Sequence, residues 1–175
     1  RNNVDTLKIS AKNAIAYYTD LNANLLSFIA LTSTTANSED SIKNIIAYYN
    51  FLMAKERAGL ERAVGANTFA AKTFAPGMYI KYLGLVDEQK IFFDAFFMYA
   101  GENQTIFNKK VNNPVMNEIQ KMRETLLSFG ENRDVVLNVE SSYWFDKMSE
   151  KINILKQIDD YLSKNMADKI AQEIS

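Results

Sequence analysis

The chain has 175 residues, with 20 Lys and Arg against 21 Asp and Glu, and it contains no Cys and no His. Without these two residue types, disulfides, thiolate zinc sites, cysteine nucleophiles, imidazole bases and His-ligated metals are excluded. The formal net charge is −1 and no basic block is present, so we expect no nucleic-acid partner. No carboxylate loop of the calcium-binding pattern occurs, and we expect neither a metal nor a cofactor.

The length fits a single domain over residues 1–175, and an apolar content of 47% is enough for one packed core. No apolar run approaches the roughly 18 residues that a membrane-spanning helix needs. The chain starts at Arg1 and shows no signal-peptide pattern. We therefore expect a segment of a longer protein, which meets a membrane only through helices outside these residues.

Six Gly and two Pro in the whole chain favour long helices, because few residues interrupt the helical backbone. Apolar residues recur at alternating steps of three and four along most of the chain, which is the helical spacing. The predicted helices span residues 4–35, 41–66, 78–100, 105–111, 115–129 and 141–175. Heptad-like spacing indicates shallow crossing angles. The predicted fold class is all-α: an antiparallel helical bundle of four long helices plus one or two short ones.

Turn and cap residues mark the ends of the second predicted helix. Ser38 or Asp40 is expected to cap its first turn, because either side chain can accept hydrogen bonds from the backbone amides there. Residues 67–77 are expected to form a connector to the third helix. Phe69 and Phe74 are expected to pin that connector to the body of the domain.

Glycines and apolar residues predict the boundaries in the second half of the chain. Gly101 is placed as a C-cap glycine after the third helix, and Gly130 is expected to close the helix over 115–129. The short run at 135–137 is compatible with an extended segment. The apolar seam of the last helix is expected to begin at Phe145 and to include Ile152.

A charged residue interrupts the apolar stripe of the second helix. At about 100° per residue, Glu56 falls about 25° from the centre of that stripe, and Arg57 falls on its shoulder. Burying an unpaired carboxylate is costly, so Glu56 needs a partner. Arg57 either pairs with a carboxylate and fixes the bundle register, or points its planar donor fork at an anion such as nitrate. The residues alone leave both interpretations open.

Gln89 lies on the seam of the third helix between Val86 and Phe93, where an apolar residue is expected. A buried amide needs several hydrogen-bond partners, so Gln89 either fixes the register or lines the same cavity as Arg57. Asn22 lies at the edge of the first helix's stripe and can face either way. No phosphate-binding loop, nucleophile elbow or base-bearing carboxylate pair is present, so an enzyme is not expected.

The run KERAGLERAV at residues 55–64, followed by NTFA at 67–70, resembles the core signature of the nitrate- and nitrite-sensing (NIT) domains of bacterial chemoreceptors. Weaker similarities to the family's first, middle and last helices lie at residues 17–26, 85–89 and 144–159. The resemblance covers nearly the whole chain. In the wider family the Arg of a Glu-Arg-Gly motif is implicated in anion binding. Arg57 matches that Arg, with Ala58 standing between it and Gly59.

The resemblance implies an all-helical sensor bundle outside the cytoplasmic membrane, which is the periplasm for a receptor of an inner membrane; such domains also occur in the cytoplasm. It implies a small anion as ligand, nitrate or nitrite. Arg57 would supply paired N–H donors and Gln89 a neutral donor. Glu56 would hold Arg57 in place, and Asn22 would support the site. A homodimer is expected, because sensor modules of this kind commonly act as symmetric pairs.

A second hypothesis gives the same residues structural roles. The domain is then a dimeric scaffold or interaction bundle that responds through a partner protein or a different small ligand. Doubled aromatics at 92–93 and 96–97 place rings on two faces of the third helix, and the outer face suits either a dimer contact or ordinary exposed rings. The two hypotheses separate on whether a selective response to nitrate or nitrite depends on Arg57.

Overall fold

The computed structural model describes residues 38–174, and this part of the chain is helical with no strand. Its helices are α3 (Glu39–Ala71), α4 (Met78–Tyr99), α5 (Asn103–Val111), α6 (Pro114–Glu131) and α7 (Ser141–Ile174). The all-α fold class is therefore confirmed. The predicted helix over 4–35, with Asn22, lies outside the described residues.

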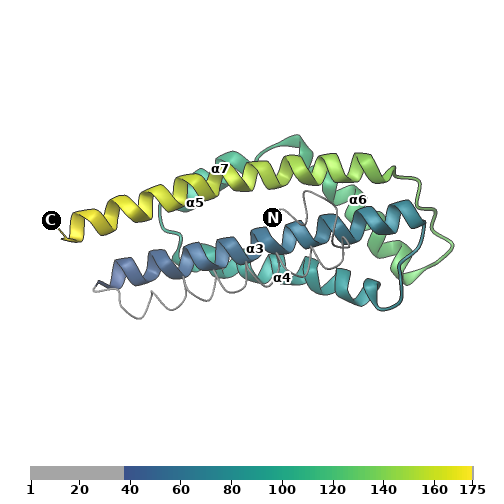
Figure 1. Ribbon diagram of the computed structural model, residues 1–175, viewed down its shortest axis with the longest axis horizontal. Coiled ribbons are helices and arrows are strands. Elements are labelled where there is room, and N and C mark those ends of the chain that lie inside the picture. The colour runs from purple at the N-terminus through teal and green to yellow at the C-terminus, as the bar shows by residue number, and fades with distance from the viewer. Residues whose placement is uncertain (1–37, 175) are drawn as a thin grey trace, which may run out of the picture.

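The described helices run antiparallel along one long axis (Figure 1). α3 packs most extensively against α4 and α7, while α5 and α6 follow one another and both contact α7. Figure 1 shows the beginning of α3 and the end of α7 at the same end of the bundle. The α3–α4 and α6–α7 connections lie at the opposite end. Among the helices from α3 to α7, none is long and apolar enough to cross a bilayer.

The ends of α3 follow from local chemistry. Ser38 Oγ accepts a hydrogen bond from the backbone N–H of Ser41 at 3.1 Å, which confirms Ser38 as the N-cap. The predicted connector at 67–77 was too long, because α3 continues through Phe69 to Ala71. The buried Phe69 ring packs at 5.7 Å from Trp144, so tertiary packing carries the helix one turn further. The chain leaves α3 at Lys72, which has a φ of 53°.

Two glycines were expected to end helices, Gly101 and Gly130, and the structure gives this role to Gly101 alone. Gly101 follows α4 with a φ of 52°, as a C-cap glycine should. Gly130, however, lies inside α6, which ends at Glu131 and has Asn132 as its C-cap. A Cβ at Gly130 would lie 1.8 Å from the ring of Tyr79, so the glycine is needed for helix contact rather than for termination. Residues 135–137, which were compatible with an extended segment, lie in an irregular connection.

The buried faces of α3 and α7 differ from the predicted stripes. In α7 Trp144 is buried and Phe145 is exposed, so the seam starts one residue earlier than predicted and continues through Met148 and Leu155. In α3 the buried face contains Ala54 and Ala58, whereas the prediction followed the larger aliphatic residues. Small residues let helices approach closely but add little to a hydrophobic pattern. Both shifts bring charged residues onto the seams.

Candidate functional site

Among residues 38–174, Glu61 on α3 is the fully enclosed carboxylate, with an exposed fraction of 0%. Arg123 on α6 forms a bidentate ion pair with Glu61. Its Nε lies 2.7 Å from Oε1 and its Nη2 lies 2.9 Å from Oε2. A paired, charge-assisted contact of this kind is the strongest arrangement open to a buried carboxylate.

Three further side chains complete the group around Glu61. From α4, Gln89 Nε2 donates to Oε2 at 2.7 Å and the Tyr82 hydroxyl donates to Oε1 at 3.3 Å. From α7, Lys151 donates to Gln89 Oε1 at 2.9 Å, and its Nζ lies 3.8 Å from Glu61 Oε2. We call Glu61, Tyr82, Gln89, Arg123 and Lys151 the Glu61 cluster. It joins α3, α4, α6 and α7 at one point.

The Glu61 cluster holds two cations and one carboxylate, which leaves a net positive charge in the interior. Burial opposes ionisation of Glu61, yet the charges and hydrogen bonds of Lys151, Arg123 and Gln89 hold its pKa below the ordinary value. Burial lowers the pKa of Lys151 to about 8, although the charge of Glu61 acts in the opposite direction. The carboxylate of Glu61 is therefore firmly ionised, whereas burial destabilises the protonated form of Lys151.

Arg57 lies in a different environment. It is half-buried on α3, and it forms ion pairs with Glu56 at 3.2 Å and with Glu88 of α4. Its guanidinium also lies 5.6 Å from the centre of the Phe92 ring. Here one cation faces two carboxylates, so the local charge balance is the reverse of that in the Glu61 cluster.

Glu56 is mostly enclosed, with 10% of its side chain exposed. Arg57 is its partner through Oε2, whereas Oε1 is buried and accepts no hydrogen bond from the part of the chain that is described. Burial raises the pKa of Glu56, and the neighbouring Arg57 opposes that rise. Arg57 is thus the partner that the sequence analysis expected for Glu56, but it hydrogen-bonds to only one of the two carboxylate oxygens.

The predicted site residues fall into two groups. Gln89 is buried on the α4 seam, as predicted, but its contacts are to Glu61 and Lys151 and not to Arg57. Arg57 forms its ion pair with α4 at Glu88, the residue before Gln89, which faces another side of that helix. Asn22 lies outside the described residues. The Glu61 cluster therefore contains one residue that sequence reasoning singled out and four that it missed.

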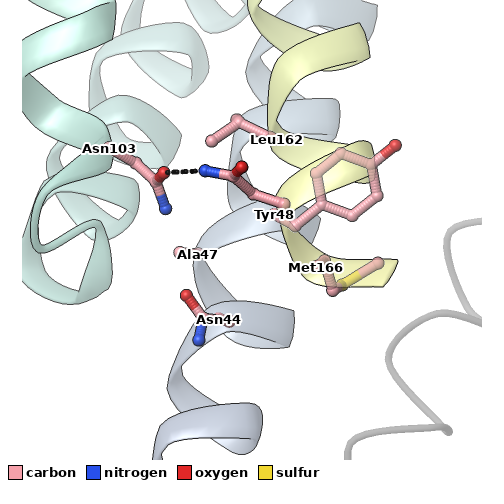
Figure 2. A pocket seen from close by; sticks show the side chains of 7 residues that line it. Asn44, Ala47, Tyr48, Asn103, Leu162 and Met166 are labelled. Carbon is pink, nitrogen blue, oxygen red and sulfur yellow. Dashed lines mark hydrogen bonds between the residues drawn. The ribbon is translucent and has the colours of Figure 1, made fainter. Parts of the chain in front are cut away.

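A small cavity lies at the other end of the bundle, where α3 begins and α7 ends (Figure 2). Its volume is about 10 Å³, which is room for about one water molecule. Neutral side chains line it: Asn44, Ala47, Tyr48, Asn103, Leu162, Asn165 and Met166. The amide of Asn165 donates to Asn103 Oδ1 at 3.4 Å across its wall. Among the described residues no cation lines this cavity, so it is a poor match for an anion.

The geometry defines a helical bundle with a buried ionic cluster. Across residues 38–174 no group of acidic side chains is suited to a metal ion. Sensor and interaction modules share this architecture, so comparison with known proteins decides between families.

The family model for nitrate and nitrite sensing (NIT) matches residues 1–167, and the chain belongs to that family. It is a family of sensor domains with a signal-transduction role and not a family of enzymes. A nitrate regulatory protein of Klebsiella oxytoca is 24% identical over 163 residues, which cover 93% of this chain and 40% of the relative. The chain thus spans about two-fifths of the length of that curated relative. No solved structure matches the chain.

Proposed function

We propose that this domain is the extracytoplasmic, ligand-sensing part of a bacterial chemoreceptor or a related signal transducer, and that its ligand is nitrate or nitrite. The observation that carries the proposal is the family match, which extends over residues 1–167 of 175. The nitrate regulatory protein among its relatives supports the same ligand class. Any membrane anchor and output domain would lie outside this segment.

The proposed ligand residues are Arg57 and Gln89, with Glu56 and Asn22 in support. The fork of Arg57 suits a planar oxyanion, and Gln89 offers a neutral amide. Arg57 is paired with Glu88, 46% of whose side chain is exposed, so an anion that binds at Arg57 would have to displace this carboxylate. Because a small anion makes few contacts, affinity of about micromolar or weaker is expected.

The proposed signal runs through the first and last helices of the domain. The predicted first helix, over residues 4–35, lies outside the described residues, and the last helix is α7. α7 ends beside the beginning of α3 (Figure 1), so both are placed to act on whatever adjoins that end. Lys55 and Tyr48 of α3 both hydrogen-bond to Asp159 of α7, which ties these two helices together. Anion binding passes a signal only if it favours one packing of the first and last helices over another.

We also propose that the domain acts as a homodimer. Ile80, Ile91 and Met98 are strongly exposed on α4, and they lie within about 20° of one line at 100° per residue. This outer apolar line is suited to contact with a second copy. Light scattering of the chain with and without nitrate tests the proposal, and a monomer under both conditions contradicts it.

Thermal unfolding in nitrate, nitrite, chloride and sulfate at fixed ionic strength tests the sensing function. A ligand at a hundred times its dissociation constant stabilises the fold by about 2.7 kcal/mol. Arg57→Ala is expected to fold and to lose the nitrate response, whereas Arg133→Ala keeps it, because Arg133 is exposed and stacks on Phe129. No selective response in the wild-type chain would contradict the sensing function.

The engagement of Arg57 by two carboxylates specifically favours the second function, a dimeric scaffold or interaction bundle that senses through a partner protein or another small ligand. In that case Arg57→Ala destabilises the domain in the absence of any anion, and nitrate leaves both the variant and the wild type unchanged. The same unfolding series distinguishes the two functions.

A further inference from the structure

We propose that Glu88 on α4 competes with the ligand for Arg57, so that an anion binds by taking the place of the Glu88 carboxylate. This inference rests on the sensing function proposed above and concerns the regulation of the same Arg57 site. It also narrows the ligand class to small, singly charged planar anions that present two oxygens as a carboxylate does. Nitrate and nitrite belong to this class, and formate is the member that tests it.

The donor fork of Arg57 is only partly occupied by Glu88. Arg57 Nε donates to Glu88 Oε2, and Nη1 donates to Glu56 Oε2 at 3.2 Å. Nη2 lies on the same edge of the planar guanidinium as Nε. Within residues 38–174 the hydrogen bonds of Arg57 are these two, so Nη2 has no acceptor in the described part of the chain.

Arg123 shows the same edge of a guanidinium when one carboxylate fills it. Glu61 accepts from both Nε and Nη2 of Arg123, at 2.7 and 2.9 Å. Glu88, in contrast, accepts from Nε of Arg57 alone. A planar anion with two oxygens can bind both nitrogens of this edge, and it then makes two charge-assisted hydrogen bonds where Glu88 makes one. The geometry therefore favours the exchange at Arg57, whereas the edge of Arg123 is already filled.

Exposure identifies Glu88, and not Glu56, as the carboxylate that leaves. The exposed fraction of the side chain is 46% for Glu88 and 10% for Glu56. A released Glu88 can be hydrated, whereas Glu56 would stay enclosed without its cation, which is costly. Ion pairs with a solvent-exposed partner are weak, so a small ligand can displace Glu88.

The rest of the site keeps Arg57 in place after the exchange. Glu56 still accepts from Nη1, and the Phe92 ring, one turn after Glu88 on α4, lies with its centre 5.6 Å from the guanidinium. Replacing one singly charged carboxylate by one singly charged anion leaves the local charge unchanged. A doubly charged anion such as sulfate would add a further negative charge beside Glu56, so the site should discriminate against it.

The test is nitrate binding by the whole chain, measured by titration calorimetry at fixed ionic strength, in wild type, Glu88→Gln and Asp87→Asn. Gln keeps the shape of the side chain and removes its charge. Asp87→Asn is the matched control, because it removes the same charge from the neighbouring, exposed position of α4, which forms no ion pair with Arg57. Glu88→Gln is expected to bind nitrate about fivefold more tightly, because a partly exposed pair lowers the population of the open fork by about that factor. Asp87→Asn should bind within about twofold of wild type, because exposed charges are screened.

The outcomes separate this inference from the sensing function. A gain of affinity does not arise from a general loss of structure, so it distinguishes competition from a purely structural role of Glu88. Equal or weaker binding by Glu88→Gln, or the same gain in Asp87→Asn, would overturn the competition and leave the sensing function standing. Binding by Glu88→Gln alone would support the competition and contradict nitrate sensing by the wild-type chain. No binding by any of the three chains would overturn both.

A competition experiment in wild type keeps the inference testable if Glu88→Gln fails to fold. Formate presents the same two oxygens and the same charge as the Glu88 carboxylate, so it should weaken the apparent affinity for nitrate. Sulfate at the same ionic strength should leave that affinity unchanged. If formate has no effect, or if sulfate competes as strongly as formate does, the proposed exchange is wrong.

Discussion

Replacing Arg123 by Leu tests how strongly the Glu61 cluster holds the bundle. The substitution removes both short contacts to a carboxylate whose exposed fraction is 0%, at 2.7 and 2.9 Å. Breaking a buried pair by removing one partner costs about 3–5 kcal/mol. Gln89 and the more distant Lys151 still face Glu61 in the variant, so the lower end, about 3 kcal/mol, is expected.

Urea unfolding at pH 7 measures this cost. With a slope of about 2 kcal/mol per molar, the midpoint of Arg123→Leu should fall by about 1.5 M at unchanged slope. Lys90→Ala is the control, because its ion pair with Asp94 is solvent-exposed and contributes at most about 0.5 kcal/mol. If Arg123→Leu loses less than about 1 kcal/mol, the two-pronged contact does not persist in solution and the structural role given to the cluster is wrong.

Two further predictions concern acid stability and helix contact. The pKa of Glu61 in the folded state lies below its ordinary value of 4.5. The stability that its ionised form contributes is therefore complete above pH 4.5 and is lost as the pH falls toward the folded-state pKa. Glu61→Gln should remove this part of the acid dependence in urea titrations from pH 7 to pH 3. Gly130→Ala should destabilise the domain by about 1–3 kcal/mol, because the new Cβ would lie 1.8 Å from Tyr79, and a melting temperature equal to wild type would contradict the close contact of α4 with α6.

Much of the fold could be predicted from the sequence, because long helices leave a strong periodic signal. The third and last helices were placed within a residue at the ends that are described, and Ser38 was among the expected caps. The buried position of Gln89 was also predicted, because it interrupts a clear heptad seam between large apolar residues. These features depend on local spacing and on cap chemistry, which a single sequence contains.

Glu61 escaped prediction because the buried face of α3 is made largely of small residues. The prediction followed the large aliphatic side chains, which centred the stripe near Glu56. In the structure the buried positions Ala54, Ala58, Glu61 and Gly65 are spaced by steps of four, three and four. That spacing is present in the sequence, but Ala and Gly contribute little to a hydrophobic pattern. The pattern therefore did not indicate that Glu61 lies on the buried face.

Lys151 was missed through a shift of one residue in α7. The prediction placed Phe145 on the seam, but Trp144 is the buried ring, because Gly65 of α3 leaves it space and its indole N–H donates to the Arg62 carbonyl at 2.9 Å. Continuing from Trp144 through Met148, the next seam position is Lys151. This choice between adjacent aromatic residues depends on a partner helix distant in sequence, which local periodicity cannot identify.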